Sequence, residues 1–324
     1  MPHSVRKRKQ RDLRKKALDR RIKDIQRLAK KHYVEPHLVK LSHVSLGELR
    51  RRFTHLNPGF KALHPALKRM EYSNRFKRYP LDPHKPLEVR GSDGGLLLVR
   101  TRLNNPQAVQ KLGMAAVKLP NPKHYKYKGI KRSNYKTLHL GSWAPYSTVC
   151  LVTRELRDAG IMGYQFLSDQ QFIWSELSRI LGQYAPGVFK QYQLYPVNDP
   201  AERFCGAWYA CVVNDGQNPN QTEAHRDVKE SLYGYSCVIA AGEFTGGALV
   251  LYELGMIVEM EPGDIVLFPD ALITHKNEPA QGHRISVVTF TQENIYDYWH
   301  RMYNMKLRRK NRNKKNNVKS KNSS

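Results

Sequence analysis

Five residues in the second half of the chain have the types and the spacing of metal and anion ligands. His225 and Asp227 are two residues apart, His275 follows 48 residues after Asp227, and Arg284 and Ser286 come next. Two imidazoles and a carboxylate suit a non-heme Fe(II) ion that keeps coordination positions open. An arginine beyond them suits the carboxylate of an organic acid that would fill two of those positions. This order predicts oxidation of an unactivated C–H bond with Fe(II), O2 and 2-oxoglutarate, with His225, Asp227 and His275 as metal ligands and catalytic residues.

A His-x-Asp triplet alone is weak evidence for a metal site, because it arises easily by chance among 13 histidines. The segment that contains Arg284 strengthens this interpretation. Side chains alternate along a strand, so Arg284, Ser286, Val288 and Phe290 would share one face. An arginine on a buried face is costly unless an anion meets it there. We therefore expect Arg284, helped by the Ser286 hydroxyl, to bind the distal carboxylate of 2-oxoglutarate.

The elements that would position these residues are short strands between positions 204 and 290. Apolar, β-branched runs alternate there with turns that contain Gly or Asp, which predicts a barrel or jelly roll. We expect His225 and Asp227 on one strand, with the strand that leads to His275 beside it. Helical spacing of apolar residues over 169–184 predicts a supporting helix. The expected fold class is α+β, a double-stranded β-helix (jelly-roll) core with supporting helices and a basic helical N-terminal region.

The net charge of +27 is unevenly distributed along the chain. Residues 137–305 carry a net charge of −9, whereas residues 1–31, 50–136 and 306–324 carry +11, +17 and +9. An enzyme for small metabolites has no need of this asymmetry, but a protein that must stay on a polyanion does. Nucleic acid is therefore the expected partner, with DNA favoured.

Four segments are expected along the chain. A basic helical arm spans 1–35, and a basic part of the catalytic unit, rich in helices and loops, spans 36–136. The dioxygenase jelly-roll core spans 137–305, and a disordered basic tail spans 306–324. In the arm, the apolar stripe consists of Leu18, Ile22, Ile25 and Ala29.

Composition also sets expectations about compartment. There is no run of 18 uncharged apolar residues, so no transmembrane helix and no membrane partner are expected. The N-terminal MPHSVRKRKQ lacks an apolar signal core, and the four cysteines form no CxxC pair, so a reducing interior is expected. RKRKQRDLRKK is typical of a nuclear import signal, which predicts a nuclear protein. We expect a monomer.

The segment HRDVKESLYGYSCVIAAGEFTGGALVLYELG, with the later PGDIVLFPDALITH and HRISVVTF, resembles the Fe(II)/2-oxoglutarate dioxygenases of the TET/JBP group, particularly compact fungal members. The likeness covers roughly residues 200–295. It implies iron held by His225, Asp227 and His275, and 2-oxoglutarate held by Arg284, with ascorbate as the expected reductant. It also implies oxidation of the methyl group of 5-methylcytosine or thymine in DNA.

The same resemblance indicates substrate-binding candidates. Glu230 stands where relatives have Asn or Asp facing the target base, and its side chain is one methylene longer than Asp. Phe290 could stack on a flipped base or fill the barrel, and Gln292 could hydrogen-bond a base edge. Asn214, at the end of the strand before the metal motif, is a further candidate.

Two alternative interpretations remain open from the sequence. A dioxygenase with the same cofactors could act on RNA, on N-alkylated bases or on a protein side chain, because charge does not separate DNA from RNA. A nucleic-acid-binding protein with a degenerate, non-catalytic barrel is the other alternative.

Overall fold

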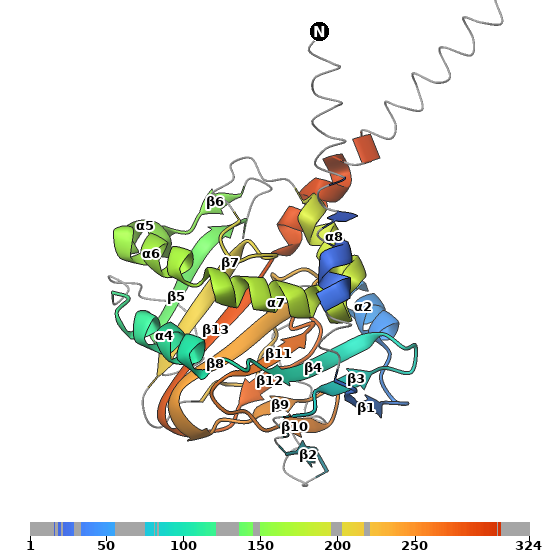
Figure 1. The fold of residues 1–324 in the computed structure, drawn as a ribbon. Helices are drawn as coiled ribbons and strands as arrows, with labels where there is room; N and C mark the ends of the chain where they lie inside the picture. The colour runs from blue at the N-terminus through green and yellow to red at the C-terminus, as the bar shows by residue number, and fades with distance from the viewer. Residues whose placement is uncertain are drawn as a thin grey trace, which may run out of the picture.

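The computed structural model of this chain describes residues 16, 19–20, 22–28, 34–55, 75–80, 82, 84–120, 136–144, 150–195, 203–216, 221–302 and 304–305. Within these residues, two β-sheets lie against each other and helices cover the outer face of the larger sheet (Figure 1). The basic tail expected at 306–324 lies outside the described residues, as do residues 121–135 of the basic segment before the core.

The larger sheet has nine strands among the described residues, in the order β1-β3-β4-β11-β8-β13-β7-β5-β6. Its neighbouring strands are antiparallel except β1 and β3, which are parallel. The bounds are β1 His37–Lys40, β3 Leu87–Arg90, β4 Leu96–Arg102, β5 Lys136–Trp143, β6 Leu151–Val152, β7 Ala210–Gly216, β8 Ser236–Gly246, β11 Asp264–Phe268 and β13 Ala280–Phe290.

The smaller sheet has the order β12-β9-β10-β2. Its strands are β2 Lys77–Tyr79, β9 Leu249–Leu251, β10 Met256–Val258 and β12 His275–Asn277. Because β12 begins at His275, this sheet carries one of the expected metal ligands.

Helices cover the outer face of the large sheet (Figure 1). Helix α4 begins after Asn105, whose side chain accepts a hydrogen bond from the Ala108 N–H, and proline occupies its first position. These helices are α4 Pro106–Val117, α5 Arg154–Ala159, α6 Ile161–Asp169, α7 Gln171–Tyr184 and α8 Pro186–Leu194, whereas α2 Leu46–His55 packs with the inner core through Leu46 and Leu49. Residues 22–28 and 293–302 are helical as well.

Side-chain alternation divides the large sheet between two hydrophobic cores. Ile285 and Val287 of β13 and Leu140 of β5 pack with helices α4 and α7 in the outer core. Ala240 of β8 and Val266 of β11 face the smaller sheet in the inner core. The period of two along each strand therefore gives every central strand an outer, helix-covered face and an inner face.

The structure agrees with several predictions and corrects others. The helix predicted at 169–184 corresponds to α7, and in the N-terminal arm Ile22 and Ile25 pack against the outer core. The run LLLVRTRL after the turn SDGG predicts a strand, which corresponds to β4, but the rest of 36–136 is expected to be helices and loops, and its strands β1 and β3 also join the large sheet. Short polar strands at a sheet edge lack a clear alternation, so the pattern does not reveal β1.

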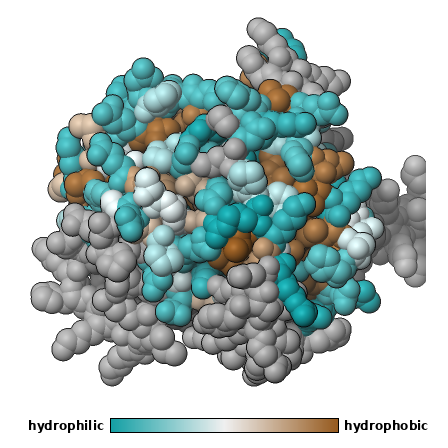
Figure 2. Space-filling model, turned by 90° about the horizontal axis from the view of Figure 1, so that it is seen from below, coloured by the Kyte–Doolittle hydropathy of each residue, from teal (hydrophilic) through white to brown (hydrophobic). Residues whose placement is uncertain are grey.

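Among the described helices, none combines the length and apolar character that crossing a membrane requires. The face of the molecule seen in Figure 2 is mostly hydrophilic, with hydrophobic areas interrupted by polar side chains.

Candidate metal centre

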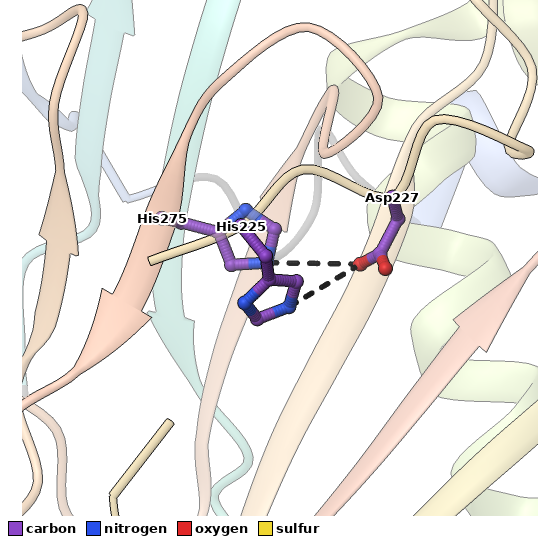
Figure 3. Close-up of side chains that lie close together, drawn as sticks. All are labelled: His225, Asp227 and His275. Atoms are coloured by element: carbon purple, nitrogen blue, oxygen red, sulfur yellow. Dashed lines mark ion pairs between the residues drawn. The ribbon is translucent and has the colours of Figure 1, made fainter. Parts of the chain in front are cut away.

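Three side chains from two separate segments of the chain meet at one point. The ligand atoms of His225, Asp227 and His275 all lie within 4.8 Å of one another (Figure 3). An Asp227 carboxylate oxygen is 3.9 Å from His225 Nε2 and 3.7 Å from His275 Nε2. Two imidazoles and one carboxylate on one side of an ion form the facial arrangement that suits non-heme Fe(II).

Backbone pairing, rather than a regular strand, brings the two histidines together. His225 and His275 form an antiparallel bridge in which each N–H donates to the other residue's carbonyl, at 3.0 and 2.8 Å. The strand expected for His225 and Asp227 is therefore replaced by an irregular segment with a single bridge at His225. This segment departs from the ladder because Asp227 N–H donates instead to the Asp270 carbonyl at 3.2 Å.

Both imidazole rings are fixed in the orientation that metal binding requires. His225 Nδ1 lies 2.7 Å from the Glu223 carbonyl oxygen, and His275 Nδ1 lies 2.9 Å from the Ile273 carbonyl oxygen. In each ring Nδ1 thus carries the proton and donates it, which leaves the Nε2 lone pair available. The donor set and its orientation fit a divalent iron ion.

Glu253 connects the two segments that carry the ligands. Its carboxylate accepts the Thr274 N–H at 2.6 Å and the Thr274 hydroxyl at 2.7 Å, directly before His275. It also interacts electrostatically with Arg226, which stands between His225 and Asp227. Burial raises the pKa of Glu253 despite the Thr274 hydrogen bonds. No local pattern in the sequence indicates this residue, because its partners are distant along the chain.

Two further carboxyl groups lie buried beside the ligands. Burial and the adjacent Asp227 raise the pKa of Asp270 well above its ordinary value. Burial raises the pKa of Glu230 well above its ordinary value, and Asp270 and Asp227 add to this effect. The site therefore concentrates carboxyl groups whose ionised forms are disfavoured by burial and mutual repulsion, and a divalent cation would stabilise those ionised forms.

Arg284 and Ser286 lie on β13, on the inner face of the large sheet, and are 1% and 5% exposed. In register, Arg284 stands between Gly242 of β8 and Gly216 of β7, so neither neighbour places a side chain beside it. Gly247 has a φ of 69°, and a Cβ there would come within 3.1 Å of Arg284 Cδ and Nε. The guanidinium is thus accommodated by glycines, an arrangement that fits an anionic cosubstrate next to it.

The predicted substrate residues Glu230 and Gln292 face each other across an antiparallel bridge. The buried Oε2 of Glu230 accepts no hydrogen bond from any described residue. Gln292 is 4% exposed, and its side-chain oxygen accepts the Ala144 N–H at 2.6 Å. The structure thus gives Gln292 a role in holding the end of β5, which its position in the sequence did not indicate.

The other two candidates also lie on the inner face of the large sheet. Phe290 is 6% exposed and its ring meets the His139 ring edge-on, with centroids 6.4 Å apart. Asn214 is opposite Ser286 in register, and its side-chain oxygen accepts the Thr137 hydroxyl at 3.1 Å. Sequence reasoning missed His139 because nothing in the residues around it indicates a site.

No protein-family model and no curated protein sequence matches the chain. Among solved structures, NgTET1 in complex with 5mC DNA is similar, with 15% sequence identity and a TM-score of 0.52, over 78% of this chain and 92% of that chain. A 2OG-Fe(II) oxygenase from Burkholderia pseudomallei has 10% identity and a TM-score of 0.35 over 79% of this chain and 94% of its own. A prolyl-4-hydroxylase from Pseudomonas putida has 13% identity and a TM-score of 0.37, over 60% of this chain and 92% of its own.

The likeness to NgTET1 shows the fold of this chain. It is a mixed α/β fold built on a large, mostly antiparallel sheet. The prediction of an antiparallel β core with supporting helices is thereby confirmed at the level of a mixed α/β fold.

Proposed function

We propose that this chain is an Fe(II)/2-oxoglutarate-dependent dioxygenase that oxidises the methyl group of a pyrimidine, 5-methylcytosine or thymine, in DNA. One observation carries the proposal: His225, Asp227 and His275 converge within 4.8 Å with both Nδ1 atoms held by backbone carbonyls. A structural role for the histidines would not require their Nε2 atoms to face the same carboxylate.

The residues of this chain divide into three roles. His225, Asp227 and His275 would hold Fe(II), while Arg284 and Ser286 would bind the distal carboxylate of 2-oxoglutarate and so fix its orientation. With O2, the bound iron and cosubstrate supply the oxidation of a C–H bond to C–OH, and 2-oxoglutarate becomes succinate and CO2. The protein contributes placement of the reactants and exclusion of bulk water.

The substrate assignment is supported by charge and by the fold. A methyl group inside a duplex cannot reach a buried metal, so the nucleotide must leave the stack. Phe290 would stack on the extruded base, while Glu230, Gln292 and Asn214 are the candidates to contact its polar edge. One solved structure of similar fold is NgTET1 in complex with 5mC DNA. The basic segments before and after 137–305 would bind the backbone phosphates.

The test incubates the protein with Fe(II), ascorbate and 2-oxoglutarate, in separate reactions with methylated DNA, unmethylated DNA, RNA and N-alkylated oligonucleotides. Nucleosides are then surveyed by mass spectrometry, and succinate is measured in parallel. We expect a mass increase of one oxygen on 5-methylcytosine or thymine in DNA. Oxidation confined to RNA or N-alkylated bases would overturn the substrate assignment.

A variant that combines His225→Ala and Asp227→Ala separates catalysis from folding. It should lose iron binding and substrate-dependent succinate release, while its circular dichroism spectrum stays that of the wild type. Unchanged turnover would contradict the iron assignment. A wild-type protein that binds DNA but neither iron nor 2-oxoglutarate by calorimetry would support the non-catalytic alternative instead.

A further inference from the structure

A histidine outside the metal centre is held rigidly at the edge of the large sheet. The Glu155 carboxylate accepts both the backbone N–H of His139 at 2.8 Å and its ring Nδ1–H at 2.9 Å. The Thr153 hydroxyl donates to the His139 carbonyl at 2.6 Å. Glu155 itself is 5% exposed. A buried carboxylate that binds one ring nitrogen fixes both the tautomer and the orientation of the imidazole.

The His139 side chain lies on the inner face of the sheet. Its neighbours Leu138 and Leu140 pack in the outer core under the helices, so alternation places the His139 ring on the opposite side. The ring is centred 6.4 Å from Phe290 and 5.2 Å from Trp143. His139 therefore belongs to an aromatic group on the face that also carries Arg284.

Strand register places this aromatic group close to the metal centre. Phe268 of β11 meets the His275 ring edge-on at 5.0 Å, and Phe268 is opposite Ser236 of β8. On β13, Thr289 pairs with Cys237 of β8, and Phe290 follows Thr289. Phe290 therefore lies beside Ser236, on the next strand of the sheet. Neighbouring strands are about 4.8 Å apart, and β11 and β13 are separated by two such spacings, so the backbones of Phe268 and Phe290 are about 10 Å apart across the sheet. His139, in contact with Phe290, borders the space where a reacting group would lie.

The contacts that hold His139 in place use its backbone N–H and its ring Nδ1, but not its ring Nε2. Glu155 already satisfies the edge N–H of β5 and the ring Nδ1–H. No described residue hydrogen-bonds His139 Nε2, and the side chain is 21% exposed. In a neutral imidazole that donates from Nδ1, Nε2 is a hydrogen-bond acceptor. The site thus presents a fixed acceptor beside an aromatic ring.

We propose that His139 is a specificity-determining residue whose Nε2 accepts a hydrogen bond from the exocyclic amino group of 5-methylcytosine, with Glu155 as its positioning residue. This inference rests on the proposed function and selects between its two bases. Cytosine presents an amino donor at position 4, whereas thymine presents a carbonyl acceptor there, which would face the Nε2 lone pair. A planar base stacked on Phe290 would bring its edge toward this fixed acceptor.

The experiment compares two target bases in otherwise identical DNA oligonucleotides. One contains a single 5-methylcytosine, and the other contains 5-methyl-2-pyrimidinone, which lacks only the exocyclic amino group. For the wild type, kcat/KM should be about tenfold lower on the second base, as expected when a site loses one hydrogen bond and leaves a partner unpaired. The His139→Phe variant keeps a ring but no acceptor, so it should treat the two bases alike. This double comparison isolates the hydrogen bond from any general loss of activity.

Two further variants separate positioning from direct recognition. His139→Gln offers an acceptor oxygen at similar reach and should restore part of the discrimination that His139→Phe loses. Glu155→Gln keeps His139 but weakens its alignment, so discrimination should fall and more succinate should form per oxidised base. His43→Phe, at an exposed histidine in a turn before α2, is the control and should match the wild type.

The outcomes distinguish this inference from the proposed function. If the wild type oxidises no pyrimidine in DNA, the proposed function fails. If it oxidises thymine but not 5-methylcytosine, or if His139→Phe still discriminates about tenfold, the inference fails while the proposed function stands. Binding of both oligonucleotides to the metal-free protein, measured by fluorescence anisotropy, gives a readout without turnover. There too, His139→Phe should lose the preference for 5-methylcytosine.

Discussion

The Glu253 carboxylate accepts two hydrogen bonds from Thr274, one from the backbone N–H and one from the hydroxyl. Thr274 precedes His275, and Glu253 also interacts with Arg226, which separates His225 from Asp227. One buried carboxylate thus interacts with both segments that supply metal ligands. Residues of this kind set the orientation of metal ligands and influence affinity strongly.

Glu253→Gln should therefore weaken Fe(II) binding by about 10- to 100-fold, because the amide keeps one acceptor and loses the charge that faces Arg226. Anaerobic isothermal calorimetry measures this directly. Glu259→Gln is the matched control, since Glu259 forms a surface ion pair with Arg78 and should leave iron affinity unchanged. Equal affinities for all three proteins would show that Glu253 does not position the ligands.

Gly247→Ala should impair 2-oxoglutarate binding through Arg284. The new Cβ would lie 3.1 Å from Arg284 Cδ and Nε, so the guanidinium must shift. Gly255→Ala is the control, because Gly255 has a similar φ of 61° but no atom within 4 Å of the added Cβ. Both variants should lose about 1–2 kcal/mol of unfolding free energy from the left-handed conformation. Only Gly247→Ala should raise the KM for 2-oxoglutarate, and a parallel rise in Gly255→Ala would contradict the assignment.

Stability should fall as pH rises through neutrality, because of Glu293. Its carboxylate accepts the Leu232 N–H at 2.7 Å, yet burial raises the pKa of Glu293 to about 7 from an ordinary value of 4.5. The favourable contribution of the protonated group is fully present below the unfolded pKa and is lost as pH rises through the folded pKa. The unfolding free energy should drop by up to about 3 kcal/mol between about pH 5 and pH 8.

Glu293→Gln should remove this part of the pH dependence, since the amide stays neutral and its oxygen can still accept the Leu232 N–H. Urea unfolding at about pH 5.5 and about pH 8.5 gives the comparison. The exposed Glu243 provides a control, and Glu243→Gln should retain the wild-type pH dependence. A Glu293→Gln protein whose stability still falls with pH like the wild type would rule out Glu293 as the cause.

Removal of residues 1–15 and 306–324 should weaken DNA binding without affecting iron affinity. The cut leaves Ile22 and Ile25, which pack on the outer core, in place. For each DNA phosphate that the shortened protein no longer neutralises, the slope of log K against log salt should flatten by about 0.9. Fluorescence anisotropy over a salt series measures the slope, and an unchanged slope would assign phosphate binding to other surfaces.

The sequence determined the features that depend on local spacing. Alternation along β13 was enough to predict that Arg284 and Ser286 share a buried face, and helical spacing was enough to predict α7. Both patterns are properties of neighbouring residues, so they can be read without the fold. The chemistry of two imidazoles, a carboxylate and an arginine is likewise a property of residue types.

Tertiary structure alone decided which distant residues meet. The bridge between His225 and His275, the hydrogen bonds of Glu253 with Thr274 and the pairing of His139 with Glu155 each join segments whose own sequences do not specify a partner. Register between strands depends on the packing of the whole sheet, and a buried polar group finds its partner only when that packing is complete. The sequence thus determined the kind of chemistry, and the fold determined the geometry that supports it.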